Sequence, residues 1–173
     1  MHLFLQGKRG VGKSTVIREA LEIIFADRVL TIGGFFTWNG GRGDPNVYMK
    51  PARQSASGEI HRLAAWDDKS KRMMCDVPVF EREGVRLLTE TADSDLIVMD
   101  ELGYLESDAV LFKETVMNTL AGSTPVLGVL RLGDVPWHEA IKCDYRVKLI
   151  DVNVKNRDSL PKELALLITK NII

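Results

Sequence analysis

The sequence predicts an α/β fold on a mostly parallel sheet, and three observations support this class. Short apolar runs alternate with segments of helical periodicity along the 173 residues. A glycine-rich stretch, GKRGVGKS at residues 7–14, joins the first apolar run to the first helical segment. A later apolar run, residues 96–99, ends in the adjacent acids Asp100 and Glu101. A chain of this length can form one sizeable core, so we expect residues 1–173 to be a single P-loop domain.

The elements follow from local patterns taken in chain order. Apolar runs bounded by turn residues predict strands at 3–5, 29–37, 47–52, 59–66, 96–99, 124–131 and 146–152. Apolar residues at 3.6-residue spacing predict helices at about 13–24, 77–93, 107–120, 136–142 and 159–168. Glycine, asparagine and charged residues predict loops at 38–46 and 67–72.

Particular residues support two of these helices. Pro78 suits the first turn of the helix at 77–93, although Gly84 inside it costs about 1 kcal/mol relative to alanine. Ser107 is the residue type that caps a helix N-terminus, and we expect it to cap the helix that follows.

Charge and cysteine content exclude several classes of protein. Lys and Arg number 23 against 24 Asp and Glu, a balance that argues against a general nucleic-acid binder. Cys75 and Cys143 form no CxxC pair, which argues against a disulfide framework or zinc site and fits a reducing cytoplasm. No apolar run reaches membrane-spanning length, and the opening residues are too short for a secretory signal. We therefore expect a cytoplasmic protein without membrane contact.

The glycine-rich stretch fits G-x-x-x-x-G-K-[ST] between a strand and a helix. Gly10 and Gly12 allow backbone amides to surround a phosphate, and the helix that starts near Lys13 directs its positive end there. Lys13 is expected to reach the β- and γ-phosphates, and the Ser14 hydroxyl to bind Mg²⁺. The predicted contacts are Gly7, Lys8, Arg9, Gly10, Val11, Gly12, Lys13, Ser14 and Thr15. For Lys8 and Arg9, a solvated face of the loop is the alternative.

The two acids predict separate roles. A strand-end Asp holds Mg²⁺ in P-loop proteins, usually through water, so we expect Asp100 to share the metal site with Ser14. The alternative is that Asp100 caps the next turn. Glu101 is placed to polarise a water molecule for attack on the γ-phosphate, which favours hydrolysis. Its alternative is a salt bridge or an indirect contact.

Arg131 ends the predicted strand that follows the acid-bearing one in the chain. The carboxyl ends of parallel strands are where α/β proteins bind ligands. Arg131 could therefore neutralise γ-phosphate charge in the manner of an arginine finger. The alternative is a rim arginine paired with Asp134.

Four stretches together resemble the small THEP-type nucleoside-triphosphatases, also called the cancer-related nucleoside-triphosphatase family. They are GKRGVGKST, GGFFT, VMDELGYLES with its following helix, and VKLIDVNVKNRDSLP. The resemblance implies a RecA-like, three-layer P-loop fold with an extra strand between the strand of the phosphate loop and the strand of the acids. It also implies Mg²⁺-dependent hydrolysis of ATP, GTP and other nucleoside triphosphates to the diphosphate and phosphate. By the same likeness, Asn156 and Arg157 would contact the base, and the alternative is a turn with surface charge.

The sequence departs from the family pattern at two places. The family usually has a charged segment after its GF-x-T, where this chain has WNGGRGDPN. The family often has Thr after Gly on the strand that here reads Gly128-Val129-Leu130-Arg131. Substrate contacts are not carried over from these two stretches.

Two other functions remain open. A small-molecule or nucleotide kinase would need an acceptor pocket and usually a basic lid, and no Arg-rich lid segment is visible. A nucleotide-dependent switch or assembly factor would turn over only with a protein partner. The sequence leaves the preferred base, any protein partner and the oligomeric state open.

Overall fold

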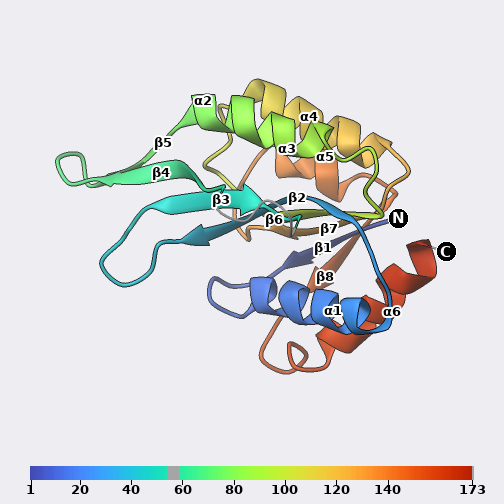
Figure 1. Ribbon diagram of the computed structural model, residues 1–173. Coiled ribbons are helices and arrows are strands. Elements are labelled where there is room, and N and C mark those ends of the chain that lie inside the picture. Colours follow the sequence, from blue (N-terminus) through green and yellow to red (C-terminus); the bar gives the residue numbers. More distant parts are fainter. Residues whose placement is uncertain (54–58, 173) are drawn as a thin grey trace.

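An eight-stranded sheet runs through the computed structural model, which describes residues 1–53 and 59–172. The strand order is β5-β4-β3-β2-β6-β7-β1-β8 (Figure 1). The parallel part consists of β1 (His2–Gln6), β2 (Ile32–Asn39), β6 (Leu96–Leu102), β7 (Val126–Leu130) and β8 (Val147–Asp151). At one edge the antiparallel strands are β3 (Val47–Pro51), β4 (His61–Asp67) and β5 (Arg72–Cys75). The predicted α/β class with a mostly parallel sheet is confirmed.

Helices cover both faces of the parallel strands, which gives three layers (Figure 1). One face carries α1 (Lys13–Asp27) and α6 (Leu160–Ile172). The other carries α2 (Val77–Val79), η1 (Phe80–Gly84), α3 (Val85–Thr89), α4 (Val110–Ala121) and α5 (His138–Lys142). Among the described residues, no helix combines the length and apolar character needed to cross a membrane.

Strand β6 shows why its sequence is a continuous apolar run. Leu96 and Val98 pack into the core below the sheet, with α1 and α6. Ile97 and Met99 pack into the core above it, with α3 and α4. A strand covered on both faces has no solvated side, so its side chains do not alternate between apolar and polar. Asp100 is still buried, and Glu101 is the first residue of the strand that is partly exposed.

Strand β7 lies between the strand of the phosphate loop and the strand of the acids. Leu127 of β7 pairs with Leu3 of β1 on one side and with Val98 of β6 on the other. This is the extra strand that the family resemblance implies. The carboxyl ends of β1, β7, β6 and β2 consequently meet at one edge of the sheet.

The antiparallel edge was predicted in part. The expected strand pair at 47–52 and 59–66 is present as β3 and β4, but β5, which begins on the last residue of the predicted loop at 67–72, was not expected. Strand β2 also extends to Asn39, so Trp38 and Asn39 belong to the sheet and not to the predicted loop at 38–46.

The helix predicted at 77–93 ends earlier and contains an irregular turn. It runs through α2, η1 and α3 to Thr89, with a π-helical turn at Phe80–Gly84. Gly84 has a packing role, because a Cβ there would lie 2.6 Å from Cδ2 of Phe112 on α4. The close approach of two helices explains a glycine that local propensity disfavours.

The predicted cap on α4 was wrong. The N-cap position is Ala109 and not Ser107, and no side chain caps the helix from that position. The Glu81 carboxylate instead accepts hydrogen bonds from the amides of Leu111 (3.1 Å) and Phe112 (3.0 Å). An acid of η1 thus satisfies the free amides of α4, with its negative charge at the positive end of the helix.

Candidate functional site

The loop between β1 and α1 has the backbone conformation of a phosphate-binding loop. Gly10 and Gly12 have φ angles of 76° and 108°, in the left-handed region that residues with a Cβ seldom adopt. Helix α1 begins at Lys13, so its free amides and positive dipole end lie at the end of the loop. The loop therefore gathers several N–H donors at one place.

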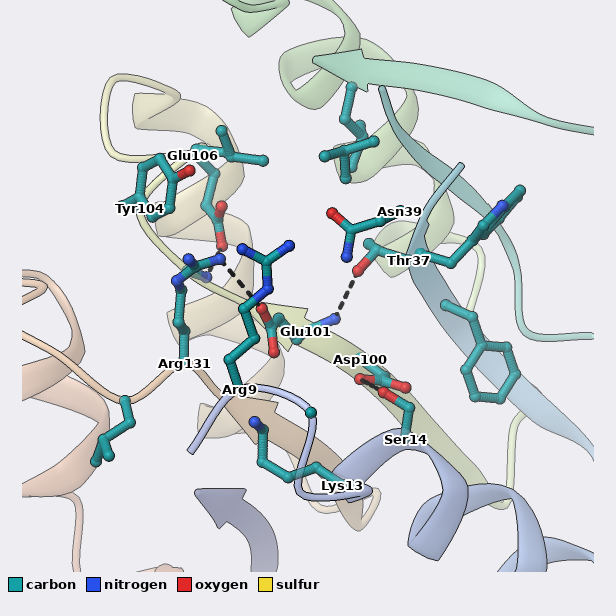
Figure 2. Close-up of a pocket in the computed structure, with 18 of the residues that line it drawn as sticks. Arg9, Lys13, Ser14, Thr37, Asn39, Asp100, Glu101, Tyr104, Glu106 and Arg131 are labelled. Carbon is teal, nitrogen blue, oxygen red and sulfur yellow. Dashed lines mark hydrogen bonds and ion pairs between the residues drawn. The ribbon is translucent and has the colours of Figure 1, made fainter. Parts of the chain in front are cut away.

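This loop forms one wall of a cavity of about 660 Å³ at the carboxyl edge of the sheet. The ends of β2 and β6, the antiparallel strands and Arg131 form other walls (Figure 2). The predicted phosphate contacts that line the cavity are Gly7, Arg9, Gly10, Gly12, Lys13, Ser14 and Thr15. Lys8 is exposed, as its alternative predicts, and Val11 packs against the core.

The Lys13 ammonium is held close to the loop. Its side chain is largely buried, and Nζ donates hydrogen bonds to the carbonyl oxygens of Gly7 (3.0 Å) and Lys8 (3.4 Å). These bonds curl the side chain back over the loop and away from solvent. The positive charge is therefore positioned beside the N–H donors that would surround a phosphate.

Ser14 and Asp100 lie together although they come from different elements. Ser14 Oγ, in the first turn of α1, donates a hydrogen bond of 3.0 Å to Asp100 Oδ1 on β6 (Figure 2). Asp100 is 2% exposed. Burial raises the pKa of its carboxyl to about 7, although the Ser14 hydrogen bond and the Lys13 charge lower it.

The oxygens of Ser14 and Asp100 fit the Mg²⁺ that the sequence predicts. Mg²⁺ prefers hard oxygen ligands, and a hydroxyl and a carboxylate oxygen lie 3.0 Å apart here. A buried carboxylate is unfavourable in its ionised form without a nearby positive charge. A divalent cation at this point would favour the ionised form of Asp100. The residues present are therefore suited to the ion.

Glu101 faces the cavity directly after the buried aspartate. Its backbone N–H donates a hydrogen bond of 3.0 Å to Thr37 Oγ1, at the end of β2. Its carboxylate Oε1 lies 3.7 Å from Nη1 of Arg131, and both side chains are about one-third exposed (Figure 2). The strand thus places one acid in the protein interior and the next in the cavity.

Arg131 lies at the carboxyl end of β7, as the sequence predicts. Its ion-pair partner is Glu101 and not Asp134, the partner in the alternative interpretation. Its guanidinium also lies over the ring of Tyr104, 4.6 Å from the ring centre. The arginine is therefore part of the cavity wall, which fits a role toward a bound phosphate.

Asn156 and Arg157 lie outside the residues that line the cavity, in the turn after β8. The Asn156 side chain bonds within its own turn: Oδ1 accepts from the Asn153 amide (2.9 Å) and Nδ2 donates to the Asp151 carbonyl (2.8 Å). Arg157 approaches the phosphate loop, with Cδ 3.9 Å from the position that a Cβ would take on Gly12. Arg157 thus lies beside the loop between β1 and α1, whereas the Asn156 amide already has a structural role.

Sequence reasoning missed three residues around the cavity. Thr37 accepts a hydrogen bond from the Glu101 amide. Asn39 points into the cavity from the end of β2, and Glu106 is 3% exposed in the turn after β6 (Figure 2). The motif residues around Glu106 were visible in DELGYLES, but nothing local indicated that this acid is buried. Thr37 and Asn39 lie at the cavity because β2 pairs with β6, and a single sequence does not show this pairing.

Comparisons with known proteins agree with this geometry. A nucleoside-triphosphatase THEP1 from Thermotoga maritima is 28% identical over 169 residues, which cover 95% of this chain and 93% of that protein. The human cancer-related nucleoside-triphosphatase is 29% identical over 179 residues, which cover 92% of each. The crystal structure of THEP1 from Aquifex aeolicus has the same fold, with a TM-score of 0.80 at 20% identity over 97% of this chain and 99% of that one.

A family model described as NTPase matches residues 2–165, which is most of the chain. The motifs that carry the resemblance, GKRGVGKST and VMDELGYLES, both fall within that range. With the loop, the acid pair and the three-layer fold in place, the protein belongs to the NTPase family.

Proposed function

We propose that this protein hydrolyses nucleoside triphosphates with Mg²⁺, and that Glu101 activates the attacking water. Membership of the NTPase family and the names of the relatives support the hydrolysis of a nucleoside triphosphate. The single observation that carries the proposed mechanism is the acid pair at the end of β6. Asp100 is buried against Ser14, while Glu101 faces the cavity beside Arg131.

In this proposal Ser14 and Asp100 hold the Mg²⁺. When bound, the ion would neutralise charge on the β- and γ-phosphate oxygens. Lys13 and the loop amides contribute the remaining stabilisation, because they are fixed in position before the substrate arrives. Lys13 needs to turn only from the Gly7 and Lys8 carbonyls toward the phosphate.

Glu101 is the group that we assign to proton removal. A bond forms between water oxygen and the γ-phosphorus, the bond to the β,γ-bridging oxygen breaks, and Glu101 takes the water proton. Arg131 is 3.7 Å from Glu101 and can serve either the carboxylate or the developing phosphate charge. Its planar guanidinium, supported by Tyr104, is suited to phosphate oxygens.

Two further residues are assigned to the side of the nucleotide base. Arg157 is placed beside Gly12, and its side chain is 44% exposed and pairs with the exposed Asp158 at 3.5 Å, an ion pair that would give way to a contact with a nucleotide. The Asn156 amide would need to exchange its bonds within the turn for bonds to a base. We therefore assign the general nucleotide contact to Arg157 and keep base reading by Asn156 as a prediction. A cytoplasmic location stays a proposal too, supported by two free cysteines.

One observation favours a second candidate, phosphoryl transfer to a small molecule. The lining of the cavity also includes the apolar side chains of Leu63, Met73, Phe80 and Leu105, which a water molecule does not require. An acceptor hydroxyl placed there could take the γ-phosphoryl group and give its proton to Glu101.

The experiment that separates the two functions is phosphate release from a panel of nucleoside triphosphates. Each reaction would be run with Mg²⁺, alone and with candidate hydroxyl acceptors. Free phosphate formed at the same rate with and without acceptors supports the hydrolase. Phosphorylated acceptor formed in place of free phosphate would support the kinase.

A further inference from the structure

Side chains bind both backbone polar groups of Gly103. The Gly103 N–H donates to Oε1 of Glu106, and the Gly103 carbonyl accepts a hydrogen bond of 3.0 Å from Nε1 of Trp137. Glu106 is 3% exposed and belongs to the same turn, whereas Trp137 comes from the segment before α5. The turn itself and a distant segment of the chain therefore both fix this glycine.

This glycine follows Glu101 by two residues, so its position determines the course of the chain after the acid. The residue between them is fixed as well, because the Arg131 N–H donates a hydrogen bond of 2.9 Å to the Leu102 carbonyl. On the other side, Thr37 holds the Glu101 amide. The backbone that carries Glu101 is thus restrained before and after the residue.

The same turn also places Tyr104, which lies against Arg131. Tyr104 follows Gly103 directly, and its ring lies under the Arg131 guanidinium at 4.6 Å. Figure 2 shows the Glu106 side chain extending from this turn toward Arg131 and the cavity. Fixing Gly103 therefore affects both side chains of the Glu101–Arg131 pair.

The ionised carboxylate of Glu106 is unfavourable at this buried position. Burial, and to a smaller extent the negative charge of Glu101, raises the pKa of Glu106 to about 7. The bond from the Gly103 amide and the positive charge of Arg131 offset part of that cost. The chain therefore keeps an unfavourable buried acid where it restrains the cavity wall.

We propose that Glu106 is a positioning residue for the hydrolytic reaction: through Gly103, it fixes Glu101 toward the attacking water and keeps Tyr104 under Arg131. The inference rests on the proposed function, in which Glu101 activates water. Glu106 itself need not contact the substrate.

The test compares Glu106→Ala with Glu106→Gln by steady-state kinetics. Glutamine keeps an oxygen that accepts from the Gly103 amide, and alanine does not. Glu106→Ala should lower kcat by about 10- to 100-fold with KM within about twofold, the scale expected when a reacting group is displaced by about 1 Å. Glu106→Gln should keep kcat within about threefold, because the hydrogen bond and not the charge positions the turn.

Trp137→Phe provides a second route to the same peptide if Glu106→Ala folds poorly. It keeps an aromatic ring but removes the N–H that binds the Gly103 carbonyl, so kcat should fall by about 3- to 10-fold at unchanged KM. Leu120→Ala is the matched control for stability: Leu120 is buried on α4 and lies outside the residues that line the cavity. It should lower the melting temperature without lowering kcat.

Measuring the effect of Glu106→Ala in a protein that also carries Glu101→Gln separates this inference from the proposed function. If Glu106 acts through Glu101, then Glu106→Ala should cost less kcat in that background than in the wild type, and only the part of the loss that passes through Tyr104 and Arg131 should remain. An equal loss in both backgrounds, or a wild-type kcat for Glu106→Ala, would overturn the positioning role alone. A wild-type kcat for Glu101→Gln would overturn the proposed water activation and, with it, this inference.

Discussion

The Ser14 hydroxyl donates to the Asp100 carboxylate across 3.0 Å, although 86 positions separate the two residues. The bond joins the first turn of α1 to the end of β6 and brings the phosphate loop to the acid pair. Because Asp100 is buried, this contact also defines where a cation would be most favourable.

Asp100→Asn should weaken the use of Mg²⁺. Asparagine keeps the size of the side chain and can accept from Ser14, but it carries no charge for the ion. Changes beyond the direct ligands of a metal cost about 10- to 100-fold in affinity, so the Mg²⁺ concentration for half-maximal rate should rise by at least about 10-fold. A Mg²⁺ titration of phosphate release measures this, with partial rescue at high Mg²⁺. An unchanged midpoint would remove Asp100 from the metal site.

Arg131→Ala should lower kcat more than it raises KM. If the guanidinium stabilises charge that develops in the transition state, kcat should fall by about 100-fold, the value of one such donor. Arg53→Ala is a suitable control, because Arg53 pairs with Glu90 outside this cavity. Equal kcat values for the two variants would return Arg131 to a simple surface ion pair.

Arg157→Ala should weaken the binding of every nucleotide moderately, since each base has a face on which a guanidinium can stack. Asn156→Ala should change the order of preference among bases if its amide reads base edges. It should also lower thermal stability, because the Asn156 amide bonds within the turn. KM values for ATP, GTP and CTP measure both effects. Wild-type KM values in both variants would place the base elsewhere.

His138 should make the protein less stable in acid. It is fully buried, and its two ring nitrogens have no hydrogen-bond partner among the described residues. Burial and the nearby Lys142 charge lower its pKa to about 4 from the ordinary value of 6.5. The unfolded chain therefore binds a proton first as pH falls, and folding stability is lost between about pH 6.5 and pH 4.

The measurement is urea unfolding at pH 7 and pH 4 of the wild type and His138→Leu. At about 1.36 kcal/mol per pKa unit, the difference between 6.5 and about 4 corresponds to about 3 kcal/mol. Between pH 7 and pH 4, the free energy of unfolding of His138→Leu should therefore fall by about 3 kcal/mol less than that of the wild type. An equal loss in the two proteins would mean that His138 does not titrate in this range.

The parts of the site that the sequence predicted are those with local signals. The phosphate loop, α1 and the acid-ended strand each occupy one stretch in which residue spacing states the structure. Arg131 was left open between an arginine-finger role toward the γ-phosphate and a rim ion pair with Asp134. The pairing of β7 with β6 brings Arg131 beside Glu101, a partner that neither interpretation named.

The parts that were missed depend on contacts between distant segments. Strand β5 has only four residues beside a charged turn, and its pairing with β4 makes it a strand. The amides at the start of α4 bind Glu81, from another helix. The Gly103 carbonyl binds Trp137, which reaches this glycine from 34 positions along the chain. No local pattern encodes any of these contacts.

The most direct test of the mechanism is the turnover of Glu101→Gln with saturating Mg²⁺ and ATP. Glutamine keeps the shape of the side chain but cannot take the proton from water, so kcat should fall by about 10²- to 10⁴-fold, the usual contribution of a general base. Nucleotide affinity and the Mg²⁺ midpoint should hold, because Lys13, Ser14 and Asp100 are unchanged. Glu139→Gln, which removes a surface partner of Lys142, should keep wild-type turnover. A Glu101→Gln protein that releases phosphate at the wild-type rate would contradict the account.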